Sequence, residues 1–223
     1  MNYVPLFLLI AGATLVGLWW SNYFVDHGIK HWLARKVGHW FGGIGFLLMP
    51  FLFPHNWIIA VVLVGTFAIM LTAARIFKPH TFRGVGGDSR PGAFAEVYFP
   101  WVAIPVLILG WGVWHRPLES VACLLFMAWG DACTGWARAL MYEKPTKGII
   151  GSILMFVVCF IIAWAFMSPL WLGTAAAAGA TLVEWACGDA SQIRWLRWTD
   201  DNWTIPATAA LVYFGGLAAL GKL

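Results

Sequence analysis

The chain alternates long apolar blocks with short segments that carry most of its charge. The blocks predict helices at residues 3–24, 40–53, 57–74, 97–113, 118–140, 149–166, 169–186 and 204–220. Crossing the hydrocarbon core of a bilayer takes a helix of roughly 20 apolar residues, with a range of about 17–25. All blocks but the second reach that range. The pattern therefore predicts an all-α fold, a polytopic transmembrane helical bundle of about eight spans.

A short amphipathic segment precedes the second block. His27, His31, Arg35 and His39 recur every four residues, and Asp26 comes just before them. This spacing predicts a helix that is capped by Asp26, has its basic side chains on one face and could lengthen the short second span. The basic face would either contribute to a site or hold anionic lipid at the membrane surface. The periodicity is compatible with both.

Composition indicates that lipid is the surrounding medium. Of the 223 residues, 61% are hydrophobic and 11% are charged, whereas a soluble domain carries about 25% charged residues. The net charge of +4 favours anionic headgroups or phosphate ligands over nucleic acid, because no soluble domain is present to display a basic surface. The four cysteines have no CxxC or Cys/His spacing, so neither a zinc site nor a disulfide framework is expected. One integral membrane domain over residues 1–223 is the simplest organisation.

The basic residues predict an orientation. Twelve of the fourteen Lys and Arg residues lie in or beside the odd-numbered loops. By the positive-inside rule these loops are cytoplasmic, which places both termini on the non-cytoplasmic side and requires an even number of spans. The twelve are Lys30, Arg35, Lys36, Arg75, Lys78, Arg83, Arg90, Arg138, Lys144, Lys147, Arg194 and Arg197.

Carboxylate and amide side chains gather on the same predicted side. Asp131 lies inside the fifth span, where an ionised group is costly unless it is paired or functional. Glu184 lies near the cytoplasmic end of the seventh span, and Asp201 and Asn202 precede the eighth. Taken singly, Asp131 could be half of a structural ion pair and Asp201 part of a helix cap. Together the four residues predict a Mg²⁺ site, since Mg²⁺ combines a few carboxylates with water and substrate phosphates.

Cations and small residues near these acids are candidates for phosphate contacts. Arg138 shares a helix face with Asp131. The segment from Lys147 to Ser152 begins the sixth helix, and a helix N-terminus with glycines and a lysine can bind phosphate. This segment is not a P-loop, because the GxxxxGK[ST] order is absent.

The ordered set of segments resembles the CTP-dependent lipid-alcohol kinases. That family comprises dolichol, polyprenol and phytol kinases and the CTP-dependent diacylglycerol kinase, and it is distantly similar to phosphatidate cytidylyltransferases. The matching segments are Arg35-Lys36-Val37-Gly38-His39 for RKxxH, Gly130-Asp131 with Gly135 for GDxxAxxxG, Lys147 to Ser152 for K[ST]xEGS, and Asp201-Asn202 with Pro206 for DNxxxP, preceded by Glu184. Arg90-Pro91 with Glu96 and Tyr98 is a fainter echo of a fifth motif.

The chain departs from the family pattern at some of these positions. Gly148 and Ile150 replace the hydroxyl residue and the glutamate of the third motif. After Asp131, Cys133-Thr134 stands where the family usually has alanine. If the family glutamate helps to hold metal, another acid must replace it here. The departures affect the identity of the phosphate donor more than the family resemblance.

The resemblance implies transfer of a phosphoryl group from CTP to the hydroxyl of a membrane alcohol, most naturally an isoprenoid of the phytol, polyprenol or dolichol type, at the cytoplasmic face. It implies catalytic roles for Asp131, Lys147 and His39 and metal binding by Asp131, Glu184, Asp201 and Asn202. The implied nucleotide and phosphate contacts are Arg35, Lys36, Arg138, Lys147, Gly148, Gly151 and Ser152. A cytidylyltransferase that forms a CDP-lipid is the alternative enzyme. A transporter is the non-enzymatic alternative, although transporter sites usually lie near the midplane.

A glycine cluster at Gly42, Gly43 and Gly45 has two interpretations. Small residues most often allow helices to pack closely. The same residues could instead line a groove for the tail of the lipid alcohol.

Overall fold

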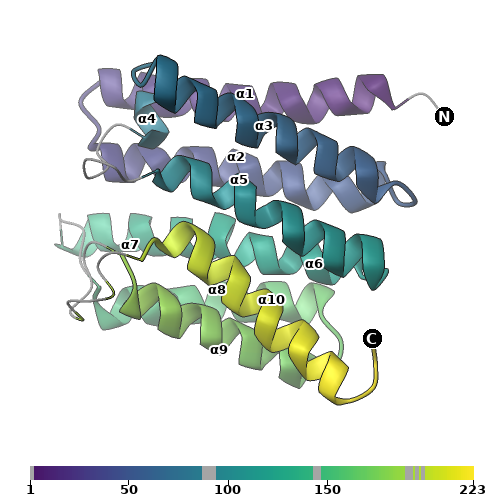
Figure 1. Ribbon diagram of the computed structural model, residues 1–223. Coiled ribbons are helices and arrows are strands. Elements are labelled where there is room, and N and C mark those ends of the chain that lie inside the picture. Colours follow the sequence, from purple (N-terminus) through teal and green to yellow (C-terminus); the bar gives the residue numbers. More distant parts are fainter. Residues whose placement is uncertain (1–2, 87–93, 143–146, 189–192, 194–195, 197–198) are drawn as a thin grey trace.

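The computed structural model describes residues 3–86, 94–142, 147–188, 193, 196 and 199–223. Within these ranges the chain is helical and has no strand, which confirms the all-α prediction (Figure 1). The elements are α1 (Val4–Asp26), α2 (His31–Leu52), α3 (Trp57–Phe77), α4 (Arg83–Gly86), α5 (Ala95–Val106), η1 (Leu107–Val113), α6 (Pro117–Leu125), η2 (Phe126–Asp131), α7 (Ala132–Tyr142), α8 (Ile149–Phe166), α9 (Leu170–Ala186) and α10 (Asp201–Ala219). Each apolar block of the sequence coincides with a helix or with a continuous run of helices.

The second block belongs to a longer helix. α2 begins at His31, so it joins the amphipathic segment to the apolar block without a break. The expected cap by Asp26 is wrong: α1 extends past its predicted end and takes in Asp26, which forms an ion pair with Arg83 instead. Lys30 directly precedes α2, and His27 lies outside it at the end of α1.

Two blocks contain π-helical segments that hydropathy does not predict. Residues 97–113 form α5 and then η1, and residues 118–140 form α6, η2 and α7. Pro100 and Pro105 lie inside α5, where each removes a backbone donor. η2 ends at Asp131, so the wider helical turn lies directly before this acid. Single π turns inside helices are frequent at functional sites.

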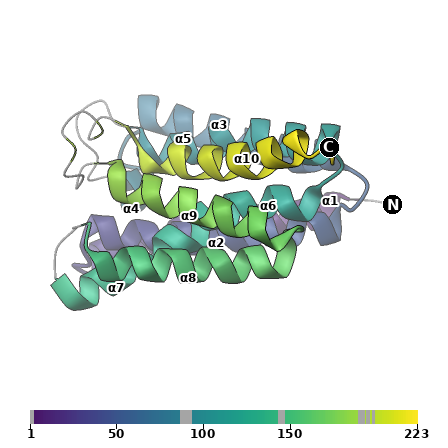
Figure 2. The same ribbon diagram turned by 90° about the horizontal axis from the view of Figure 1, so that it is seen from below.

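The helices form a bundle around α6 and η2, as the two views show (Figures 1 and 2). α1 packs on α2, α3 on α5, α10 on α9, and α8 on both α7 and α9. α6 contacts α2, α5, α8 and α10, and every residue from Ser120 to Ala128 is buried. Asp131 therefore follows the most enclosed helical run of the described chain.

The outward faces of the bundle are strongly apolar. Leu8, Ile69, Trp164 and Leu211 are among many large apolar side chains that are well exposed. Patches of this kind suit lipid rather than water. Of the described helices, four are long and apolar enough to cross a membrane: Val4–Asp26, Trp57–Phe77, Glu96–Val113 and Ile149–Phe166.

The two ends of the bundle differ in content. Both chain termini lie at one end, and the first turns of α2 and α10 lie with α4 at the other (Figure 1). Asp201, the first residue of α10, belongs to that second end. Four of the basic residues used to predict orientation, Arg90, Lys144, Arg194 and Arg197, lie outside the described residues.

Candidate functional site

A buried group of charged side chains joins segments that are far apart in the sequence. We call it the charged cluster, and its members are Lys36, His39, Asp131, Arg138, Lys147, Glu184 and Asp201. They come from α2, the end of η2, α7, the turn before α8, α9 and the start of α10. Charged residues are seldom fully buried unless they are paired, and the cluster provides the pairing.

Asp131 faces Lys36 and His39 of α2. The ammonium of Lys36 donates a hydrogen bond to Oδ2 of Asp131, and Nδ1 of His39 lies 3.5 Å from the same oxygen. Lys36 and His39 are three residues apart and so share a helix face. Gly135 makes room for this approach, because a Cβ at that position would lie 2.5 Å from Cε of Lys36. The structure thus brings together Asp131, Lys36 and His39, three residues that the family resemblance assigns to one site.

Arg138 and Glu184 form a bidentate ion pair. Nη1 and Nη2 of Arg138 donate to the two oxygens of Glu184 at 2.8 and 3.1 Å, and Glu184 is fully buried. This fork geometry is the strongest form of an arginine–carboxylate contact. Gly151 faces the guanidinium so closely that an added Cβ would overlap it. Arg138 therefore pairs with Glu184 and not with Asp131, the nearer acid in sequence.

Lys147 bridges two carboxylates. Its ammonium lies 2.6 Å from Oε1 of Glu184 and 3.2 Å from Oδ2 of Asp201. Burial disfavours the charged form, but the charges of Asp201 and Glu184 outweigh burial and raise the pKa of Lys147. Lys147 therefore stays a cation, placed directly before α8, whose N-cap is Gly148.

The start of α10 is fixed by its cap. The side chain of Asp200 accepts a hydrogen bond from the backbone N–H of Asn202 at 2.8 Å, which is the usual arrangement of an N-cap residue. This cap holds Asp201 toward Lys147 and leaves Asn202 fully buried. Gly188 lies beside Asp201 with φ of +87°, a backbone conformation that glycine adopts without strain.

The acids of the cluster converge. One carboxylate oxygen from each of Asp131, Glu184 and Asp201 lies within 4.8 Å of the others. Oxygen ligands of this kind suit Mg²⁺, so the donor set fits such an ion. In the structure each carboxylate contacts a cation: Asp131 contacts Lys36, while Glu184 and Asp201 share Lys147. An ion at these oxygens would require Lys147 to move aside.

The other predicted phosphate contacts lie around the cluster. Arg35 is half-buried on α2 beside Lys36. Gly148 and Gly151 lie at the start of α8, and the absence of a side chain at Gly151 leaves room for the guanidinium of Arg138. The hydroxyl of Ser152 is buried and has no hydrogen-bond partner among the described residues. The Arg90-Pro91 part of the faint fifth motif lies outside the described residues.

A further acid with a buried side chain is Glu96, which the sequence assigned only to the faint fifth motif and not to the site. Glu96 lies near the start of α5, with Oε1 3.5 Å from Nε of Arg75 at the end of α3. Its side chain is 5% exposed. Glu96 directly precedes the predicted block 97–113 and lies in the first turn of α5, and an ionisable residue at such a position is a signal of function or pairing.

Comparisons with protein families, curated proteins and solved structures give no match to this chain.

Proposed function

We propose that the protein transfers a phosphoryl group from a nucleoside triphosphate, CTP by family resemblance, to the hydroxyl of a membrane alcohol of isoprenoid type. The observation that carries the proposal is the convergence of Lys36, Asp131, Lys147, Glu184 and Asp201 in one buried cluster. Phosphoryl transfer is mainly a matter of positioning reactants and stabilising charge. A site that combines several carboxylates with several cations suits that task.

In the proposed reaction, the oxygen of the alcohol bonds to the terminal phosphorus while the bond from that phosphorus to the bridging β-phosphate oxygen breaks. The alcohol loses its proton, and the products are a lipid monophosphate and a nucleoside diphosphate. Asp131, next to His39, would orient the hydroxyl and accept or relay its proton. Lys36, Arg35, Arg138 and the start of α8 would hold phosphate oxygens.

Mg²⁺ is the proposed metal, held by Asp131, Glu184 and Asp201 with Asn202 close by. When bound, it would neutralise charge on the transferring phosphates. The ion pairs of the cluster suggest how Lys147 takes part. Moving Lys147 away from Glu184 and Asp201 frees their oxygens for metal and frees its ammonium for phosphate. Metal and nucleotide would therefore bind better together than either binds alone.

We further propose that all eight blocks cross the membrane and that the charged cluster faces the cytoplasm. The positions of both termini at the end opposite the first turns of α2 and α10 (Figure 1) support an even number of crossings. The positive-inside distribution of Lys and Arg supports the orientation. The charged cluster would then meet cytosolic nucleotide while lipid surrounds the apolar faces.

The test is direct product analysis. Purified protein in lipid is incubated with Mg²⁺, with CTP or ATP, and with a mixture of lipid alcohols that includes phytol, geranylgeraniol and dioleoylglycerol, and the products are read by mass spectrometry. A Mg²⁺-dependent lipid monophosphate is the expected result. A CDP-lipid with pyrophosphate would identify a cytidylyltransferase instead. If no donor gives a product, while proteoliposomes show nucleotide-independent flux of a solute, a transporter replaces both enzymes.

A further inference from the structure

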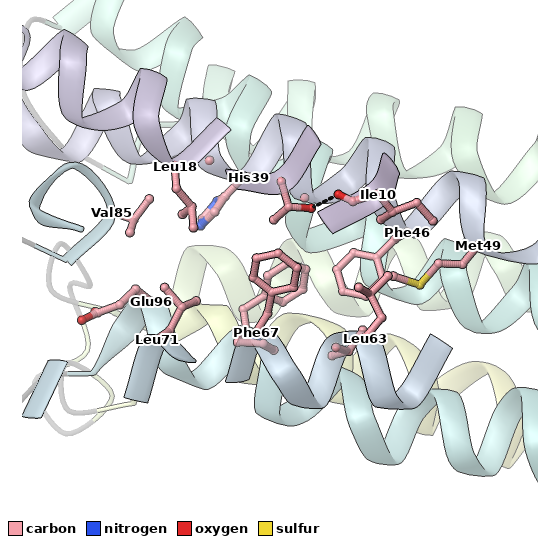
Figure 3. A pocket seen from close by; sticks show the side chains of 17 residues that line it. Ile10, Leu18, His39, Phe46, Met49, Leu63, Phe67, Leu71, Val85 and Glu96 are labelled. Atoms are coloured by element: carbon pink, nitrogen blue, oxygen red, sulfur yellow. Dashed lines mark hydrogen bonds between the residues drawn. The ribbon is translucent and has the colours of Figure 1, made fainter. Parts of the chain in front are cut away.

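A small apolar cavity lies directly beside the charged cluster. It has a volume of about 100 Å³, is partly open, and is lined by residues of α1, α2, α3, α4 and α5. Ile10, Phe46, Met49 and Leu63 line one end, and Phe67 lies along the middle (Figure 3). These side chains offer no hydrogen-bonding atom, so the walls suit hydrocarbon.

The other end of the cavity is polar. His39 points into it from α2, and Glu96 lies at the same end on α5 (Figure 3). Nδ1 of His39 is buried and lies 3.5 Å from Oδ2 of Asp131, so this nitrogen faces the charged cluster while the ring borders the cavity. Thr14, the other polar side chain of the lining, donates its hydroxyl to the backbone oxygen of Ile10 at 3.0 Å. An apolar cavity with His39 and Glu96 at one end suits a ligand that has a hydrocarbon body and one polar end.

His39 connects the cavity with the charged cluster. The same ring that lines the cavity lies beside Oδ2 of Asp131. A hydroxyl placed against His39 would therefore lie at the boundary between the apolar cavity and the carboxylates. Hydrocarbon on one side and charges on the other is the arrangement that an alcohol with an apolar tail needs.

We propose that this cavity binds the part of the alcohol next to its hydroxyl, with the hydroxyl at His39 and the adjoining carbons toward Phe46 and Leu63. This inference rests on the proposed phosphotransfer function. A cavity of about 150 Å³ holds one benzene ring, so the present volume accommodates roughly four or five carbons of a single chain. α1 and α3 make little contact with each other, and the rest of the tail leaves between them into lipid.

The size of the cavity determines the substrate class. The cavity contacts only the first carbons after the hydroxyl, so the length of the tail does not affect binding. Isoprenoid alcohols of different length therefore bind alike, because they share the same first unit. Diacylglycerol does not bind, because two ester-linked chains begin next to its hydroxyl and the volume of the cavity accommodates only one chain.

A second apolar hollow lies between α1, α2, α7 and α8, lined by residues that include Trp20, Trp40, Trp136 and Leu154. It is a broad depression on the outer face, and none of its lining residues belongs to the charged cluster. The cavity beside His39 is therefore the better site for the reacting end of the alcohol.

Gly42 provides the test. It lines the cavity, and a Cβ at this position meets nothing within 4 Å, so Gly42→Leu fills the cavity without a clash against the backbone. Gly65 on α3 also has nothing within 4 Å but does not line the cavity. Gly65→Leu is thus the matched control, and Gly42→Ala is a milder variant in case the leucine impairs folding. Leu154→Phe reports on the outer hollow.

Each variant is assayed in lipid with farnesol, geranylgeraniol and dioleoylglycerol. We expect the wild type to phosphorylate the two isoprenoid alcohols with kcat/KM values that agree within a few-fold and to leave dioleoylglycerol unchanged. Gly42→Leu should lower kcat/KM for both isoprenoids about tenfold or more, as overpacking of an occupied cavity predicts. Gly42→Ala should lower it less, and Gly65→Leu should not lower it. Wild-type transfer that Gly42→Leu leaves unchanged, or that only Leu154→Phe weakens, overturns the proposal.

A binding measurement separates this inference from the proposed function. A photoreactive geranylgeraniol analogue is cross-linked to the protein without nucleotide, and the adduct is mapped by mass spectrometry. Adducts on α2 and α3 that disappear in Gly42→Leu would support the binding site even if no donor yields a product. Adducts confined to the outer hollow would refute it even if transfer occurs.

Discussion

Neutralising Glu184 is the sharpest test of how the charged cluster is held together. Glu184 is fully buried, and Glu184→Gln keeps the shape of the side chain while removing its charge. The change leaves Arg138 without its bidentate partner, whereas Lys147 still has Asp201 at 3.2 Å. Only one buried cation, Arg138, therefore loses its carboxylate partner, and Lys147 keeps one.

The magnitude follows from this count of lost contacts. Removing one partner of a buried ion pair destabilises a protein by about 3–5 kcal/mol. Because Lys147 retains a carboxylate, we expect a loss near the lower value, about 3 kcal/mol. Glu119 is the matched control, since it pairs with Arg116 at 3.1 Å while Arg116 remains 34% exposed. A partly exposed pair contributes about 0–1 kcal/mol, so Glu119→Gln should have little effect.

The assay is reversible unfolding in mixed lipid–detergent micelles by titration with a denaturing detergent, followed by tryptophan fluorescence. A double variant adds a second check: Arg138→Met combined with Glu184→Leu replaces the pair by apolar groups and should recover much of the lost stability. If Glu184→Gln costs no more than Glu119→Gln, or if the double variant is less stable than Glu184→Gln alone, the ion pair does not have the role assigned to it.

Three further predictions concern the site and the topology. Asp131→Asn should lower phosphoryl transfer about a hundredfold or more while the protein still inserts and elutes as a folded species; near wild-type transfer would remove Asp131 from the mechanism. Gly151→Ala should destabilise the protein by about 1–3 kcal/mol through the overlap with the guanidinium that it faces, whereas Gly65→Ala should not, and equal unfolding curves would contradict the packing. In intact cells, a membrane-impermeant maleimide should label His55→Cys but should reach His80→Cys only after permeabilisation, measured against the native cysteine background; the reverse pattern would invert the proposed orientation.

Much of the helical framework could be predicted from hydropathy. The predicted block 149–166 coincides with α8, and the other blocks agree with helices to within a few residues except at the second. There the pattern changes from amphipathic to apolar, and hydropathy assigned only residues 40–53 to the span, although the preceding segment could lengthen it. α2 is continuous because nothing between His31 and Leu52 interrupts its backbone ladder until Pro50, near its end.

The π-helical segments could not be predicted in the same way. Hydropathy reports which face is buried, but one extra residue in a turn changes that pattern little. In η2, which ends at Asp131, every residue except Trp129 is buried, so its wider turn depends on packing against neighbouring helices rather than on local residue preference.

The gathering of Asp131, Glu184 and Asp201 was predicted from the sequence, but the ion pairs that they form were not. Asp131 and Arg138 share a helix face, which suggested a local ion pair. In the structure Asp131 contacts Lys36 of α2, and Arg138 contacts Glu184 of α9. The packing of the helices determines which residues become partners. Residue spacing along one helix does not predict which other helix lies beside it.

The same pairings constrain how the protein assembles in a bilayer. Arg138 contacts a carboxylate 46 residues later in the chain, and Lys147 contacts one 54 residues later. While the chain is being made, these two cations enter the membrane region before their partners exist, so the early helices remain incompletely neutralised. When α9 and α10 pack against the bundle, they bring the carboxylates that pair with these two cations. A chain shortened before Glu184 should therefore be a target for membrane quality control rather than a smaller stable bundle.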